Sequence, residues 1–356
     1  YTNNQQHDHQ YNNFTNFKFY LDIFSKHIPD MKRFTIFVFF LFLSFQLTYL
    51  TAQDIGIGEW RDHLPYNNAI SVAAAGNRVY CATPYSLFYY NKSDNSVNRL
   101  TTVNGLNDQG ISTIAFSDEY NTLVIAYSNT NIDLVKSNTI INMPDILNSA
   151  AVTPEERSIN NIMFIDNLAY LSCGFGIVVI DLIREEVLET YYIGAQGTHI
   201  DVMDLTFSET KFYAATEEGI YIADRNDPNL AFFDAWSKDT TLPHPDDLYS
   251  LIEYFDNVVI ANRYMQGWRG DTLYFLKDNV WQTIPEFSDV DAFDMFSEGD
   301  ELYITFYSYV RSYDADFNVN TNLVNYVIDG KSYYPQPRCT RKDNTGLWIA
   351  DRLNGM

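Results

Sequence analysis

Cysteine and positive charge are scarce in this chain, and both shortages limit what it can be. Its 356 residues include only three cysteines, Cys81, Cys173 and Cys339, and their spacing matches no metal-binding motif. We expect small buried hydrophobic residues, with at most one disulfide among them if the chain is exported. Lys and Arg number 23 against 46 Asp and Glu, a net charge of −23. Without clustered cations the chain should bind no nucleic acid, and its acidic surface indicates solubility.

Histidine is also too sparse to suggest catalysis. After residue 53 the sequence contains only His63, His199 and His244, which are isolated from one another and lack the spacing of a zinc site. An enzyme would need convergent acids, a nucleophile with its base, or metal ligands. Folding can bring distant residues together, but the sequence predicts a non-enzymatic protein with no cofactor and no metal.

Two acidic segments could bind a metal or supply catalytic acids. Residues 314–318 (DADFN) alternate oxygen ligands like a calcium loop, but Val319 stands where that loop requires glycine. We therefore predict a turn between strands there. Asp289, Asp291 and Asp294 are interleaved with apolar residues, and we interpret this run as the solvated entry of a strand, not as a catalytic pair.

Aromatic residues, in contrast, are abundant. They make up 16% of the chain, with 27 Tyr and 25 Phe, and these residue types favour pleated, half-buried strands. The hydrophobic content of 46% is enough for a large core without disulfides or a metal. Composition therefore predicts an all-β protein.

The beginning of the chain has the features of a leader sequence. Residues 31–52 resemble a secretory signal peptide, because two basic residues precede an apolar run and the segment ends in the small residue Ala52. A permanent membrane anchor is the alternative, since Phe34 to Leu50 is near the shortest length that spans a bilayer. Residues 1–30 are rich in Asn, Gln and His, and we interpret them as translated upstream sequence. We therefore expect an exported protein.

A short strand motif recurs every 43 to 46 residues from residue 79 onward. Each copy has a bulky residue, a variable one and then a small one. An apolar strand and a hairpin turn precede each copy, and two further strands follow it. Each repeat is therefore predicted to be a four-stranded antiparallel meander, the blade of a β-propeller. The bulky residues of the seven copies are Tyr80, Val124, Tyr170, Tyr213, Val259, Tyr303 and Trp348.

The repeat predicts an all-β propeller over residues 53–356 with seven blades, six of them complete and the last one half present. Stacked meanders without ring closure would leave long exposed edge strands. Residues 54–66 have no place in the first blade, and we expect them to pair with the last blade as its outer strand. Because Met356 falls within the seventh repeat, we expect the sequence to be a fragment cut in mid-domain. The blades should start near residues 69, 111, 159, 202, 248, 290 and 335.

Two stretches carry resemblances to known families. Residues 343–351 (DNTGLWIAD) resemble the repeats of two-component regulator propellers, with Asp351 in place of the usual Thr. Residues 57–68 (IGEWRDHLPYNN) resemble the start of the PorZ family, the propeller proteins of the Bacteroidetes type IX secretion system. The second resemblance implies a seven-bladed first propeller that is followed by a second propeller and a C-terminal sorting domain.

The PorZ resemblance also implies a function. Such proteins are non-enzymatic components of a cell-surface complex that attaches secreted cargo to anionic lipopolysaccharide. The implied partners are other secretion-system surface proteins and the anionic glycan, and the implied location is the cell surface or the outer membrane. The other resemblance implies an alternative, the extracytoplasmic ligand-sensing propeller of a hybrid two-component regulator. A propeller lyase or hydrolase is a third class, for which the sequence offers no motif.

One loop departs from the repeat. Residues 263–272 separate two strands of the fifth blade and form a longer loop than the corresponding segments of other blades. An enlarged loop on a rigid scaffold can serve for recognition, and a Trp beside an Arg can stack on a sugar ring and bind an acidic group. A tolerated surface insertion is the alternative. The predicted ligand-binding residues are Arg263, Tyr264, Trp268 and Arg269.

Overall fold

The computed structural model describes residues 65–137, 139–266, 270–283 and 285–356. The predicted signal peptide, the residues upstream of it, and the predicted closing strand up to residue 64 lie outside these ranges. Within the described ranges, no helix is long and apolar enough to cross a membrane.

The described residues form six four-stranded antiparallel sheets, each with its strands in chain order, although β21 also pairs with β19 in the fifth. The first three contain β1 (Ser71–Ala75), β2 (Arg78–Thr83), β3 (Ser86–Asn91), β4 (Ser96–Leu100), β5 (Ile111–Ser117), β6 (Thr122–Tyr127), β7 (Ile132–Lys136), β8 (Thr139–Met143), β9 (Ile159–Ile165), β10 (Leu168–Cys173), β11 (Gly176–Asp181) and β12 (Glu186–Tyr191). The next three contain β13 (Val202–Phe207), β14 (Lys211–Thr216), β15 (Gly219–Asp224), β16 (Trp236–Lys238), β17 (Tyr249–Phe255), β18 (Val258–Arg263), β19 (Asp271–Lys277), β20 (Val280–Gln282), β21 (Ser288–Val290), β22 (Ala292–Glu298), β23 (Glu301–Phe306), β24 (Val310–Tyr313) and β25 (Val319–Leu323).

Two hairpins and some short helical turns complete the described chain. The hairpins are β26 (Tyr326–Ile328) with β27 (Lys331–Tyr333), and β28 (Pro337–Asp343) with β29 (Gly346–Asp351). The 3-10 turns lie in connecting segments, at Pro154–Glu156, Ala195–Gly197, Phe233–Ala235 and Pro285–Phe287.

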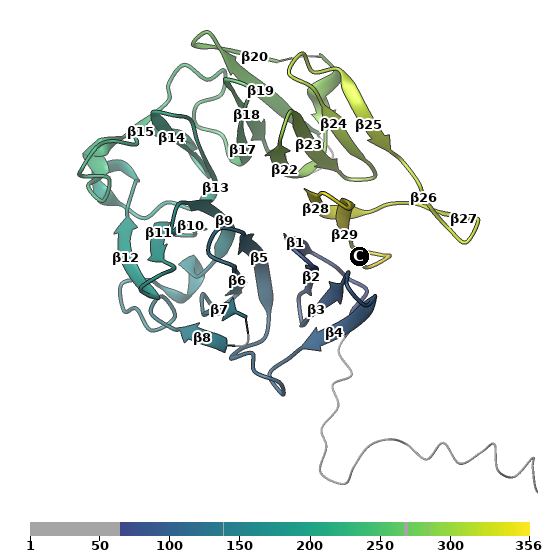
Figure 1. Cartoon of the computed structure of the whole chain (residues 1–356). Helices are drawn as coiled ribbons and strands as arrows, with labels where there is room; N and C mark the ends of the chain where they lie inside the picture. The colour runs from purple at the N-terminus through teal and green to yellow at the C-terminus, as the bar shows by residue number, and fades with distance from the viewer. Residues whose placement is uncertain (1–64, 138, 267–269, 284) are drawn as a thin grey trace, which may run out of the picture. The chain divides into compact units, whose positions relative to one another are not determined.

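The sheets are arranged as the blades of a propeller (Figure 1). The first strand of each blade lies nearest the centre, and these strands contact one another in sequence order around the ring. The hairpin β28–β29 lies between the sixth blade and the first, because β28 contacts both β22 and β1. The predicted all-β propeller of four-stranded blades is confirmed. The predicted count of seven blades is not confirmed, because the described residues form six four-stranded blades and one two-stranded sheet, β28–β29. We call this two-stranded sheet the seventh sheet.

The second strand of each repeat places a small residue in a deeply buried position. The small residue two positions after each bulky one is at most 1% exposed in all seven repeats, as at Ala82, Ser172 and Thr305. Crowding between adjacent sheets explains this pattern, because a larger side chain there would force the sheets apart. These small residues therefore allow the sheets to approach one another near the axis.

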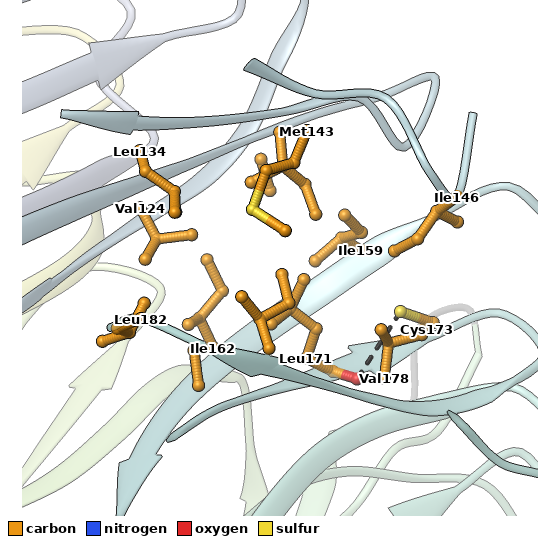
Figure 2. Close-up of a cluster of buried hydrophobic side chains, with 14 of the residues drawn as sticks. Val124, Leu134, Met143, Ile146, Ile159, Ile162, Leu171, Cys173, Val178 and Leu182 are labelled. Atoms are coloured by element: carbon orange, nitrogen blue, oxygen red, sulfur yellow. Dashed lines mark hydrogen bonds between the residues drawn. The ribbon is translucent and has the colours of Figure 1, made fainter. Parts of the chain in front are cut away.

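Apolar layers between adjacent blades form the core. Figure 2 shows the layer between the second and third blades, where Val124 and Leu134 face Ile162 and Leu171. Leu171 is fully buried, and burying a leucine side chain contributes about 1.5 to 3 kcal/mol. Cys173 lies in the same layer, and its thiol donates a 3.5 Å hydrogen bond to the Leu171 carbonyl. The prediction that the cysteines are buried is confirmed for all three, and each is a free thiol in the structure.

Tight turns join the strands of each blade. Asp256 and Asn257 both have positive φ, 44° and 64°, as a two-residue hairpin turn between β17 and β18 requires. Gly176 begins β11 with a φ of 142°, and a Cβ there would lie 2.2 Å from the Tyr191 carbonyl oxygen. Only glycine therefore allows β11 and the end of β12 to approach this closely.

Candidate functional site

A central cavity of about 640 Å³ opens where the innermost strands begin. Each of the seven sheets of the ring contributes at least one lining residue, so the cavity lies on the propeller axis. These contributions include Ile70, Ser112, Asn160, Met203, Ser250, Phe293 and Arg338.

A repeated β-bulge turns these side chains towards the cavity. In β5, Ile111 pairs with Tyr127 and Thr113 pairs with Ala126, so Ser112 has no partner of its own. The same shift occurs near the start of the other innermost strands after the first, namely β9, β13, β17, β22 and β28. A bulge interrupts the alternation of side chains and redirects the extra residue. As a result, two successive residues such as Ser112 and Thr113 both line the cavity.

Side chains of one innermost strand bind the backbone of the next. The Ile114 N–H donates to Ser71 Oγ at 3.3 Å, and the Ile252 N–H donates to Asp204 Oδ2 at 2.8 Å. In the third case, the Thr340 N–H donates to Asp294 Oδ2 at 2.8 Å and so joins the seventh sheet to the sixth blade. These bonds occupy backbone donors that no neighbouring strand satisfies, and they fix the cavity wall.

Two carboxyl groups of the innermost strands are buried deeply enough to change their ionisation. Burial raises the pKa of Asp204, which lines the cavity, to about 6, although the Asn161 amide and two backbone N–H groups donate to it. Burial also raises the pKa of Glu253 on β17 to about 8, and Ser297 Oγ donates to Glu253 Oε1 at 2.6 Å. Glu253 therefore holds a proton at neutral pH, which reduces the negative charge carried by the innermost strands.

The acidic run that we interpreted as a solvated strand entry is only partly solvated. Asp289 and Asp291 are exposed, but the Asp294 side chain is 14% exposed and forms a 2.8 Å ion pair with Arg341 Nη1. The same carboxylate also accepts the Thr340 N–H. Asp294 is therefore a structural residue of the ring, and the interpretation was wrong at this position, because the bulge in β22 turns its side chain towards β28.

Two arginines and two aromatic residues lie together at the edge of the cavity, and we call Phe293, Tyr307, Arg338 and Arg352 the arginine rim. The Arg338 guanidinium carbon is 4.0 Å from the centre of the Phe293 ring, and the Phe293 and Tyr307 rings are 6.2 Å apart. Burial lowers the pKa of Arg338, and the positive charge of nearby Arg352 lowers it further. Within the described ranges, neither guanidinium forms an ion pair or a hydrogen bond.

The arginine rim can therefore bind an anion. Its two guanidinium groups can donate to a carboxylate or phosphate, and its aromatic faces can stack on a ring. Phe293 and Tyr307 are 38% and 50% exposed, so both rings are accessible. The Asp351 carboxylate is near enough to raise the pKa of Arg338, so the positive charge of the rim is only partly compensated.

The predicted loop residues lie partly at this cavity. Tyr264 is 44% exposed and lines the cavity together with Met265. Arg263 is not among the residues that line the cavity, and its Nε donates a hydrogen bond to Asp247 Oδ2 at 2.6 Å. Trp268 and Arg269 lie outside the described residues, so their role stays a prediction.

Sequence reasoning missed the arginine rim, although a signal existed. Phe293 and Arg338 occupy the same bulged position in consecutive repeats, where other repeats have small or flexible residues such as Ser112 and Met203. Aligning the repeats at that position would have placed both side chains at the cavity.

The other candidate motifs have structural roles. Asp314 accepts the backbone N–H groups of Asp316 and Asn318 at 3.0 and 2.9 Å, which confirms the predicted turn between β24 and β25. His199 lies 2.9 Å from Glu156 and stacks on the Tyr192 ring. In the described part of the chain, no group of three or more His, Cys, Asp or Glu side chains could hold a metal ion.

Comparison with known proteins supports the propeller and narrows its family. The family model of the N-terminal β-propeller domain of PorZ, from the type IX secretion system, matches residues 79–237. The resemblance to PorZ is thereby confirmed. The solved structure of PorZ from Porphyromonas gingivalis, described as an essential bacterial surface component of that system, superposes with a TM-score of 0.66 at 18% identity. The match covers 84% of this chain and 37% of PorZ, so this chain corresponds to little more than a third of that protein.

A second solved structure shows the fold alone. The computationally designed Ika8 protein superposes with a TM-score of 0.53 at 8% identity, over 82% of this chain and 95% of the designed one. Comparison with curated protein sequences finds no match.

Proposed function

We propose that this PorZ-like propeller is a non-enzymatic, exported recognition component of a type IX secretion machinery. In this role it binds an anionic glycan of the cell surface through the arginine rim and contributes to attaching secreted cargo there. Its partners are other surface proteins of the same system. The match to the PorZ family model favours this function over the ligand sensor of a two-component regulator.

The observation that carries the proposal is the pair of guanidinium groups beside the central cavity, neither of which forms an ion pair or a hydrogen bond within the described ranges. Acidic sugars present carboxylates for Arg338 and Arg352, and apolar ring faces for Phe293 and Tyr307. Elsewhere around the cavity, Ser112, Ser250 and other polar side chains can bind sugar hydroxyls. Asp271 also lines the cavity, and its carboxylate can accept a hydrogen bond from a sugar hydroxyl.

Calorimetric titration of the purified chain with anionic lipopolysaccharide from the source bacterium tests the proposal. The double variant Arg338→Gln, Arg352→Gln should bind at least about tenfold more weakly, because hydrogen bonds to charged groups contribute roughly 1.5 to 3 kcal/mol each. Neutral lipopolysaccharide lacking the acidic groups should bind the wild type weakly and should not distinguish the variant from it.

A matched control comes from another arginine that stacks on phenylalanine. The Arg225 guanidinium carbon is 4.4 Å from the Phe207 ring centre, but its Nη1 already donates to the Ser208 carbonyl at 2.8 Å. Arg225→Gln should leave glycan affinity unchanged. Equal affinities of the rim variant and the Arg225 variant would contradict the proposal.

A further inference from the structure

Two buried cysteines meet where the seventh sheet packs against the first blade. Cys81 lies on β2 and Cys339 on β28, and both belong to the same apolar layer, together with Val72, Val79 and Ala350. Cys81 is 0% and Cys339 6% exposed. The third cysteine, Cys173, is buried in a different layer, between the second and third blades.

Hydrogen bonding and strand register link Cys339 to the strand that pairs with Cys81. The Cys339 Sγ lies 3.8 Å from the Val72 carbonyl oxygen, a contact between residues 267 positions apart in the sequence. Val72 is the direct strand partner of Cys81 in the β1–β2 pair. Cys339 therefore contacts the residue directly opposite Cys81 on the adjacent strand. The Cys339 charge is near enough to raise the pKa of Cys81, as burial also does.

We propose that Cys81 and Cys339 form a redox-dependent disulfide that locks the seventh sheet to the first blade. The inference goes beyond glycan recognition, and it depends on the proposed function only for export to an oxidising compartment. Cys339 also lines the central cavity, so a small oxidant can reach it from the axis.

Forming this disulfide requires an oxidant that is itself a disulfide, either a low-molecular-weight disulfide or a thiol oxidoreductase. The Cys339 thiolate attacks one sulfur of the oxidant and expels a thiolate. The Cys81 thiolate then attacks the Cys339 sulfur and expels the second thiolate. The protein loses two protons and two electrons, and the oxidant is reduced to two thiols.

The rate of this reaction should depend strongly on pH. The thiolate is the attacking species, and burial raises the pKa of Cys339 to about 11. Cross-linking should therefore be slow at neutral pH and accelerate about tenfold for each unit by which pH rises towards 11.

Incubation of the purified chain with oxidised glutathione tests the proposal. Peptide mass spectrometry without reduction should find the peptide containing Cys81 linked to the peptide containing Cys339. The oxidised chain should unfold at a higher temperature than the same chain after reduction, because the cross-link closes a very long loop of the unfolded chain. Comparing one chain in two redox states avoids any folding defect of a variant.

Variants separate the cross-link from general thiol oxidation. Cys339→Ala should remove both the linked peptide and the redox difference in melting temperature, whereas Cys173→Ala should keep both. Absence of the linked peptide after the glutathione has reacted with the protein thiols would overturn the proposal, and so would equal melting temperatures of the oxidised and reduced chains. Neither result would bear on glycan binding by the arginine rim.

Discussion

The complete blades and the two-stranded seventh sheet bury the same position of the repeat to different extents. Ile260 and Ile304, each next to the bulky residue of its repeat, are 0% exposed, whereas Ile349 at the corresponding position of β29 is only partly buried. The layer between the second and third blades contains sixteen buried residues, and the layer beside the seventh sheet contains seven. Among the described residues, the apolar layer beside the seventh sheet is therefore smaller than the layer between these two complete blades.

Polar contacts reinforce the joint where packing is weaker. Lys342 on β28 pairs with Glu301 of the sixth blade at 2.7 Å, and Asp343 pairs with Lys92 of the first blade at 2.7 Å. The Asp294–Arg341 pair lines the central cavity and so lies nearer the axis. The comparison indicates that the ring is held by apolar layers between complete blades and in part by charge at the seventh sheet.

The largest effect should come from truncating a core residue of a complete blade. Ile260→Ala should lower the free energy of unfolding by about 2 to 5 kcal/mol, because it leaves a cavity in a fully buried layer. The matched variant Ile349→Ala should cost about 1 kcal/mol, since its site already reaches solvent. Urea denaturation of both variants measures the difference. Equal losses would refute the contrast in packing.

Removing the carboxylate that joins the sixth blade to the seventh sheet should have the next largest effect. Asp294→Ala leaves the Thr340 N–H without its acceptor and the Arg341 guanidinium without its ion-pair partner, and should cost about 2 to 4 kcal/mol. Asp291→Ala, at an exposed position of the same segment, is the control and should cost under about 0.5 kcal/mol. Denaturant midpoints of the two variants would be indistinguishable if Asp294 did not hold the ring.

The pH dependence of stability should report on Glu253. Its pKa is raised from 4.5 to about 8, so the folded protein holds this proton more tightly than the unfolded chain. The resulting stability is complete below pH 4.5 and is lost as pH rises through about 8. Glu253→Gln cannot ionise and should therefore remove this loss. The difference in stability between the variant and the wild type should shift in favour of the variant by about 1 to 3 kcal/mol from low to high pH. Thermal melts across that range measure it, and Glu298→Gln, at an exposed site of β22, should keep the wild-type slope.

The smallest effect should come from the exposed end of the seventh sheet. Lys342→Met breaks the pair with Glu301, whose side chains are 37% and 21% exposed, and should cost at most about 1 kcal/mol. The cost should shrink further in high salt, which screens exposed charges. A loss as large as that of Asp294→Ala would show that the outer pair is as important as the inner one.

The repeat itself was predictable because it reflects local physics. A strand buried between two sheets needs bulky and small residues at fixed positions, so the bulky residues such as Tyr80 and the small residues such as Ala82 recur at constant spacing. The four-stranded antiparallel blade follows from that spacing and from the turn residues. The count of six complete blades follows from the same spacing, and the structure describes two strands, β28 and β29, in the last repeat.

The candidate site was less predictable because it depends on contacts between repeats. No local pattern reveals that a bulge turns Arg338 towards Phe293, or that Asp294 meets Arg341 across two strands. The loop at residues 263–272 attracted the prediction through its length and composition, and only Tyr264 and Met265 of its described residues line the cavity. Non-local hydrogen bonds and bulges thus determine which residues meet at the site, whereas local periodicity determines the strands of each blade.

Cargo attachment in cells tests the central claim most directly. The double change Arg338→Gln, Arg352→Gln should be introduced at the chromosomal gene, with Arg225→Gln as the control, and secreted cargo should be measured in washed cells and in the medium. We predict that cargo moves from the cell surface to the medium in the rim variant while the level of the propeller protein stays normal. Cargo that stays on the surface, in a variant that no longer binds anionic lipopolysaccharide, would contradict the account.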